Sequence, residues 1–292
     1  MKRAGLLLAI ALLGACAGQP AVEPGFNDPA ALPYVMAHGV SIDVQVPREG
    51  FVGAAMVIDA KTAAAASQTS DSVARGGAGA GLIGLLVVSA INSRIGAGAL
   101  ERDARENAQK DARPMADLLA NEALGERLRA RYRLASQTAG LAQAQGSVSA
   151  RLLIEPHLVL SADRDSFVLI SRVQVQDIAG STLYRRRIAV VGQTLRSCGA
   201  QCIDDGRLEL NKVNDQLQQC IDETLRTLLA DLQAGEGVVG EEQTVRYVLD
   251  GHRVVERGRL LPGTGLYHRY RDLDGALKSV PAPFEGIAAG GQ

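Results

Sequence analysis

Three strand-like segments follow one another between residues 150 and 195, and a long amphipathic segment comes soon after them. The strand candidates are ARLLIEPHLVLS, DSFVLISRVQVQD and STLYRRRIAVVGQTL. The residues DIAG between the second and the third are typical of a hairpin turn. The simplest fold for this succession is an antiparallel meander, so we expect the three segments to be neighbouring strands of one sheet.

The apolar face of such a meander must be covered, and two helices are available to cover it. One is predicted over residues 208–232, where apolar side chains recur at three- and four-residue steps. The other is predicted to begin at Pro114 and to run to Ala135. One face of the middle strand is expected to point at these helices: Phe167, Leu169, Ser171, Val173 and Val175.

Shorter strands are predicted on both sides of this core. VSIDVQV alternates apolar and polar residues, and FVGAAMVI follows from Phe51, so the turn-forming residues 47–50 are expected to join them as a hairpin. Two further hairpins are predicted within residues 243–281, and they are too small to bury a core alone. The sequence therefore predicts an α+β domain over residues 34–235 with a mainly antiparallel sheet, a small C-terminal β appendage at 243–281 and a disordered tail at 282–292.

The N-terminus has the layout of a secretory signal. Lys2 and Arg3 precede an apolar run that is too short to span a bilayer, and small residues follow before Cys16. The stretch Leu13-Gly14-Ala15-Cys16 resembles the lipobox of bacterial lipoproteins. This resemblance implies that residues 1–15 are removed and that Cys16 becomes an N-terminal cysteine carrying fatty acids such as palmitate. The alternative is an ordinary signal peptide with an incidental cysteine.

The residues after Cys16 indicate where the mature protein is held. In lipoproteins of enteric bacteria an aspartate after the cysteine is associated with inner-membrane retention, and here the residue is Ala17. The resemblance therefore implies the periplasmic face of the outer membrane. Residues 16–33 are rich in proline and glycine and lack apolar periodicity, which predicts a lipidated tether.

An uncharged, glycine-rich segment, GGAGAGLIGLLVVSAINS, lies between Arg75 and Arg94. Within a helix predicted over 76–99, Gly77, Gly81 and Gly84 would leave a groove into which another backbone can pack. Three interpretations stay open: packing inside the domain, contact with a partner or second copy, and insertion in a bilayer.

The order of elements across residues 40–232 is similar to that of uncharacterised envelope lipoproteins of Gram-negative bacteria. It comprises a strand pair, the segment GLIGLLVVSAINSR, a charged helix and a strand-rich half. This resemblance implies no catalytic residue.

Three cysteines remain if Cys16 is acylated, and an oxidising compartment favours pairing between them. One disulfide is expected within Cys198, Cys202 and Cys220, either between the first two or from one of them to Cys220. No fourth ligand lies near these cysteines in the sequence, so no metal site is expected.

Charge and aromatic content argue against nucleic-acid binding. Loss of the leader leaves 29 basic against 32 acidic residues, and aromatic residues make up only 3% of the chain. Two basic runs stand out from this balance. RLRARYR (127–133) is predicted to be a solvated helix face, and Arg185-Arg186-Arg187 is predicted to cap or bind something within a strand.

No catalytic motif is apparent. The chain has no G-x-S-x-G, H-E-x-x-H or P-loop sequence, and Asp163 and Asp165 read as turn residues. The histidines are widely separated in sequence: His38, His157, His252 and His268.

We therefore expect no catalysis and no cofactor, and predict a binding or scaffolding component of the cell envelope. Its expected partners are the membrane, through the lipid, and an envelope protein or a second copy. The alternative is a cell-wall hydrolase or another periplasmic enzyme, which would need carboxylates, histidines or cysteines to meet in a cleft.

Overall fold

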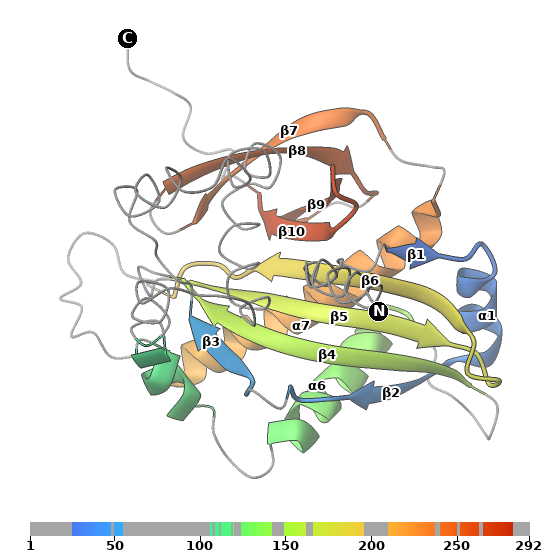
Figure 1. Ribbon diagram of the computed structural model, residues 1–292, viewed down its shortest axis with the longest axis horizontal. Helices are drawn as coiled ribbons and strands as arrows, with labels where there is room; N and C mark the ends of the chain where they lie inside the picture. Colours follow the sequence, from blue (N-terminus) through green and yellow to red (C-terminus); the bar gives the residue numbers. More distant parts are fainter. Residues whose placement is uncertain are drawn as a thin grey trace, which may run out of the picture.

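The computed structural model describes residues 25–282, with gaps at 48–49, 55–105, 107–108, 111, 118, 120–123, 142–148, 162–165, 196–209, 237–239, 250–251 and 263–264. The described part is an α+β fold built on one ten-stranded sheet (Figure 1). The predicted α+β class is confirmed. The sheet is mixed, however, and not mainly antiparallel as expected.

The centre of the sheet is the predicted meander. β4 (Ala150–Leu160), β5 (Phe167–Gln176) and β6 (Thr182–Val191) pair antiparallel in chain order. The turn between β5 and β6 contains Gly180 at φ +85°, a left-handed conformation that glycine adopts without steric cost. The local sequence pattern therefore predicted the position of these three strands and their pairing.

Each outer edge of the meander is extended by two strands placed end to end. β2 (Val40–Val44) and β3 (Val52–Ala54) both pair parallel with β4. The expected hairpin between them is therefore wrong. The connecting turn does not reverse the chain: both segments run along β4 in the same direction, which brings Ile42, Val44 and Phe51 into one core.

The other edge of the meander pairs with the first and the last of the described strands. β1 (Phe26–Asn27) pairs antiparallel with the first half of β6, and β10 (Leu277–Pro281) pairs parallel with its second half. Residues 26–33 were expected to belong to the tether, but β1 and the start of α1 (Ala31–His38) occupy them. Burial of Ala31 and Val35 explains why this segment joins the fold.

The C-terminal strands continue the same sheet. β7 (Glu242–Leu249) pairs with β8 (His252–Leu260), and β9 (Tyr267–Asp272) pairs with both β8 and β10. The strands of the two predicted hairpins are present, but they do not form a separate docked unit. They are linked through β10 to β6, so the sheet runs β2-β4-β5-β6-β10-β9-β8-β7.

Two cores lie on opposite faces of this sheet. α6 (Leu124–Thr138) and α7 (Leu210–Ala234) cover one face, as predicted (Figure 1). Four of the five residues predicted to face them belong to this core, and the fifth, Ser171, is buried against Tyr132 of α6. On the other face, a second core joins side chains of β4, β5 and β6 to the inward side of β7 and β8. The sheet therefore curls, so that its last hairpin packs over its own centre.

Candidate functional site

Eight of the residues singled out in the sequence lie outside the described residues. This holds for the acylation candidate, the glycine groove, two cysteines and two aspartates: Cys16, Gly77, Gly81, Gly84, Cys198, Cys202, Asp163 and Asp165. The glycine-rich helix expected at 76–99 and all of the tail expected at 282–292 except Ala282 also lie there. Ala282 donates a backbone hydrogen bond of 2.8 Å to the Leu266 carbonyl and therefore belongs to the fold. The interpretations of these segments therefore stay predictions.

Cys220 is described, and it lies in the centre of the core. Its thiol is free and its side chain is fully buried on α7. Burial, and secondarily the nearby Glu223, raise the pKa of this thiol far above its usual value. A buried, protonated thiol is a poor nucleophile and a poor metal ligand. Pairing between Cys198 and Cys202 stays the prediction for a disulfide.

The most distinctive polar feature of the described fold is a buried stripe on α7. Glu223, Thr227 and Asp231 are four residues apart, so they lie on one side of the helix, and each is at most 2% exposed. Isolated buried carboxylates are costly, and each must find a partner of opposite charge. The partners come from β6, β9 and β10.

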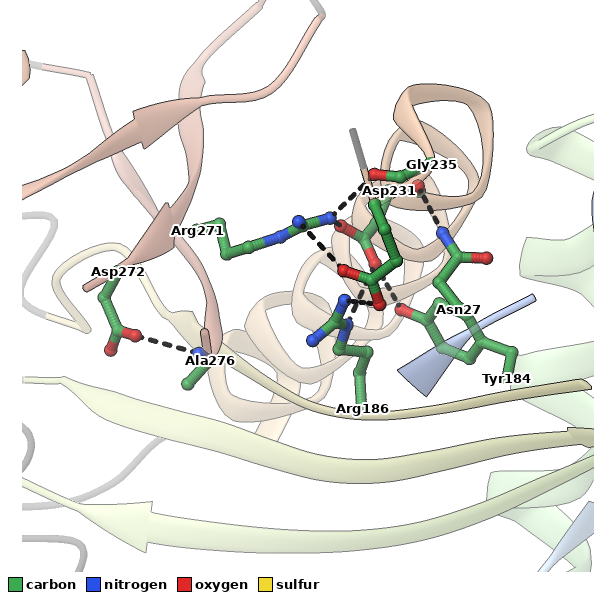
Figure 2. A network of polar contacts seen from close by, with 9 residues as sticks. Asn27, Tyr184, Arg186, Asp231, Gly235, Arg271, Asp272 and Ala276 are labelled. Atoms are coloured by element: carbon green, nitrogen blue, oxygen red, sulfur yellow. Dashed lines mark hydrogen bonds and ion pairs between the residues drawn. The ribbon is translucent and has the colours of Figure 1, made fainter. Parts of the chain in front are cut away.

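Asp231 forms the larger of the two clusters on this face, which Figure 2 shows. Its Oδ1 accepts a hydrogen bond of 2.5 Å from Arg271 of β9. Its Oδ2 accepts one of 3.1 Å from the Tyr184 hydroxyl and lies 3.4 Å from Nε of Arg186, both on β6. Its backbone carbonyl accepts a hydrogen bond of 2.9 Å from Asn27 of β1. One residue near the end of α7 thus binds three strands.

A second carboxylate completes the charge balance of this cluster. Glu236, just beyond the C-terminal end of α7, binds Arg186 at 2.5 Å and Arg271 at 3.4 Å through separate oxygens. Arg271 also donates a hydrogen bond of 3.1 Å to the Gly235 carbonyl. Two guanidinium groups are therefore neutralised by two carboxylates. Burial, and then the charge of Asp231, raise the pKa of Tyr184 well above its usual value, so this hydroxyl stays a hydrogen-bond donor.

Glu223 forms the other cluster on this face of the sheet. Arg269 of β9 binds both of its oxygens, at 2.6 and 2.9 Å, in the paired geometry that suits guanidinium and carboxylate. The Ser279 hydroxyl of β10 adds a hydrogen bond of 2.6 Å to Oε1. The two clusters together hold both β9 and β10 on α7.

A third ionic group lies in the second core, on the opposite side of β9 and β10. Glu256 of β8 accepts bonds from Lys278 at 3.1 and 3.2 Å and from the Tyr270 hydroxyl at 2.5 Å. Lys278 also lies 3.2 Å from Asp272. The C-terminal strands are therefore fixed by buried charge pairs on both of their faces.

Some arginines of the two basic runs bond to other residues of the chain. Arg186, from the run at 185–187, is the residue that binds Asp231 and Glu236. The run at 127–133 was expected to be a solvated helix face, yet Arg127 donates to the Leu119 carbonyl and Arg131 donates to Asn214 of α7. Arg133 is exposed, so only part of the expected solvated face is present.

The histidines lie on four different elements. His38 ends α1 and stacks on Tyr34, whereas His157 of β4 lies against Gly53 of β3. The other two belong to β8 and β9. Within the described ranges, no three His, Cys, Asp or Glu side chains are grouped as metal ligands. No helix in that part of the chain is long and apolar enough to cross a membrane.

Comparison with known proteins gives no relative: no family model, no curated protein and no solved structure matches this chain.

The acidic partners were missed by reasoning from sequence. Glu223 and Asp231 interrupt a helix whose neighbouring positions were recognised as apolar, and this interruption was the available signal. Arg186 comes from β6, whereas Arg269 and Arg271 come from β9, which is linked to β6 through β10 by pairings between segments distant in sequence. Both oxygens of Asp231 and of Glu223 are bonded to side chains of β6 or β9. These buried carboxylates therefore hold α7 on the sheet.

Proposed function

We propose that this protein is a lipid-anchored binding or scaffolding component of the cell envelope, held on the periplasmic face of the outer membrane, and that it catalyses no reaction. Its partners are the membrane, through the lipid, and an envelope protein or a second copy of the chain. The observation that carries the proposal is the position of the lipobox cysteine relative to the fold.

The described fold begins at Gly25, and Phe26 is already paired with β6. Cys16 lies nine residues before Gly25. A chain of that length spans at most about 30 Å when fully extended. A lipid on Cys16 would therefore keep the folded part next to the bilayer, as expected for an envelope component that stays at one membrane.

The hydrogen bonds and ion pairs of the buried carboxylates support a binding role over a hydrolytic one. General acid-base catalysis needs a carboxyl group that can reach a substrate and exchange a proton with it. Asp231, Glu223 and Glu256 are buried, and their oxygens are bonded to arginine, lysine, tyrosine or serine side chains. Such groups stabilise the fold and leave no oxygen free for a substrate.

The anchoring is tested by Cys16→Ala in cells that carry the tagged full-length gene. We expect the native protein to fractionate with the outer membrane and to incorporate radiolabelled palmitate, and the variant to accumulate unprocessed and unlabelled. Normal processing of Cys16→Ala would contradict the proposal. Incubation of the purified protein with peptidoglycan sacculi tests the second part, because release of soluble fragments would show that it is a cell-wall hydrolase.

A further inference from the structure

The outward face of the β7–β8 hairpin concentrates positive charge on a chain of net charge −1. Alternate residues of the two strands share this face, and it carries four exposed arginines: Arg246, Arg253, Arg257 and Arg259. Arg257 is paired with Glu242 at 2.8 Å. Among the described residues, none forms an ion pair with the other three arginines.

Two apolar side chains are interleaved with these arginines. Val248 is 66% exposed and lies opposite Arg253, whereas Val255 is 55% exposed and lies opposite Arg246. The inward side chains of the same strands are buried in the second core, so the hairpin is a rigid platform. A face of arginines and exposed valines suits a surface that offers phosphates above an apolar layer.

The place where the N-terminal chain joins the fold lies beside the base of this hairpin. Gly25 lies directly against the Arg186 side chain, and Arg186 binds Glu236. Glu236 is only six residues before Glu242, the first residue of β7, a span of at most about 20 Å. Figure 1 shows β1, the end of α7 and the beginning of β7 on the same side of the molecule.

We propose that the outward face of the β7–β8 hairpin docks on anionic phospholipid headgroups of the membrane that holds the lipid anchor. The inference rests on the proposed lipid anchoring, because a tether of about 30 Å from Gly25 would hold this face within reach of the bilayer. The anchor would supply proximity, and the arginines would then orient the folded part by binding phosphates. Several acyl chains on one cysteine suffice for stable attachment, so the arginines would act on the orientation of the folded part and not on its retention.

The test uses the chain from residue 17 to 292, which lacks the leader and Cys16 but keeps every described residue. Its sedimentation is measured with vesicles of phosphatidylcholine alone and with vesicles that also contain phosphatidylglycerol. We expect binding only to the second kind, and we expect added salt to weaken it, because screening shortens the range of charge attraction to about 10 Å at 0.1 M.

The variant Arg246→Gln/Arg253→Gln should bind the anionic vesicles about 25-fold more weakly, at about fivefold for each arginine. The matched control, Arg133→Gln/Arg226→Gln, removes the same charge from exposed positions on α6 and α7 and should keep native binding. Both variants should melt as the parent chain does, since all four side chains are exposed. A second double variant of the face, Arg257→Gln/Arg259→Gln, repeats the test if the first one changes the melting temperature.

Failure of the parent chain to bind anionic vesicles would overturn the inference. So would equal weakening by the hairpin and control variants, which would mean that net charge alone decides binding. Unchanged binding by both hairpin variants would also overturn it, because it would mean that another part of the chain binds the anionic vesicles. None of these results depends on Cys16, so they leave the proposed anchoring to be judged separately by the processing of Cys16→Ala.

Discussion

At the scale of single residues, Asp231 does the most to join distant parts of the chain. It lies on α7 and contacts β1, β6 and β9 through four hydrogen bonds or ion pairs. Removing one member of a buried charge pair leaves the others desolvated without compensation, which is far more damaging than losing an exposed pair.

We predict that Asp231→Asn lowers the free energy of unfolding by about 3–5 kcal/mol, because Arg186 and Arg271 would share only Glu236. The matched control is Asp117→Asn, whose carboxylate is 73% exposed and lies 3.8 Å from Arg113. Exposed pairs of this kind contribute about 1 kcal/mol or less. Urea denaturation of both variants checks the difference, and equal losses would mean that the buried cluster is not a stabilising contact.

Residue roles of this kind were only partly accessible from the sequence. The charge of the run at 185–187 predicts that it caps or binds something, but the partner of Arg186, Asp231, is 45 positions away along the chain. A helical pattern fixes which residues share a side of α7. It does not show which strands will pack there, so the pairing of Arg186 with Asp231 required the tertiary structure.

At the scale of elements, strong local periodicity was enough to place β4, β5, β6 and α7. Strand alternation and three- to four-residue helical spacing report directly on which side of an element is buried. The direction in which β2, β3 and β10 pair depends instead on contacts between distant segments, and sequence reasoning mistook two parallel partners of β4 for a hairpin. The same limitation hid the parallel β10–β6 pairing that makes the C-terminal strands part of the main sheet.

The contact between β8 and β9 depends on one glycine, and we predict that Gly258→Ala destabilises the protein by about 1–3 kcal/mol. A Cβ at this position would lie 2.7 Å from the Arg271 carbonyl oxygen and 2.5 Å from the Tyr270 ring, so the two strands would have to separate. Thermal melting and hydrogen exchange of β8 and β9 measure the effect.

Gly125→Ala provides the control for this substitution. Gly125 lies in α6, and the nearest neighbour of an added Cβ would be Val46 at 3.8 Å, so the change should be neutral or should stabilise by up to about 1 kcal/mol. If both alanine variants melted alike, close approach of β8 and β9 at Gly258 would not be needed for stability.

At the scale of the whole molecule, both cores bury tyrosine hydroxyls, and this predicts how stability depends on pH. The pKa values of five of the six tyrosines are raised, with burial as the largest cause in each: Tyr132, Tyr184, Tyr247, Tyr267 and Tyr270. Below pH 10 these groups are protonated in both the folded and the unfolded chain, so their contribution to stability is complete. Above pH 10 the unfolded chain loses protons that the folded chain keeps, so stability falls as the pH rises.

The expected loss is about 1.4 kcal/mol per pH unit for each buried tyrosine above pH 10. Tyrosinate absorbance and far-ultraviolet circular dichroism, followed together in an alkaline titration, provide the check. We expect the five tyrosines to ionise only as the circular dichroism signal is lost. Reversible ionisation of these five tyrosines near pH 10 with the secondary structure intact would show that their hydroxyls reach solvent in the folded protein.

The proposed lipid on Cys16 is tested by the mass of the N-terminal peptide of the protein purified from the envelope of its native cells. We expect a chain that begins at Cys16, without residues 1–15, and whose first peptide carries the added mass of a diacylglyceryl group and a fatty acid. A mature chain that begins at another residue, or an N-terminal peptide in which Cys16 is unmodified, would contradict it.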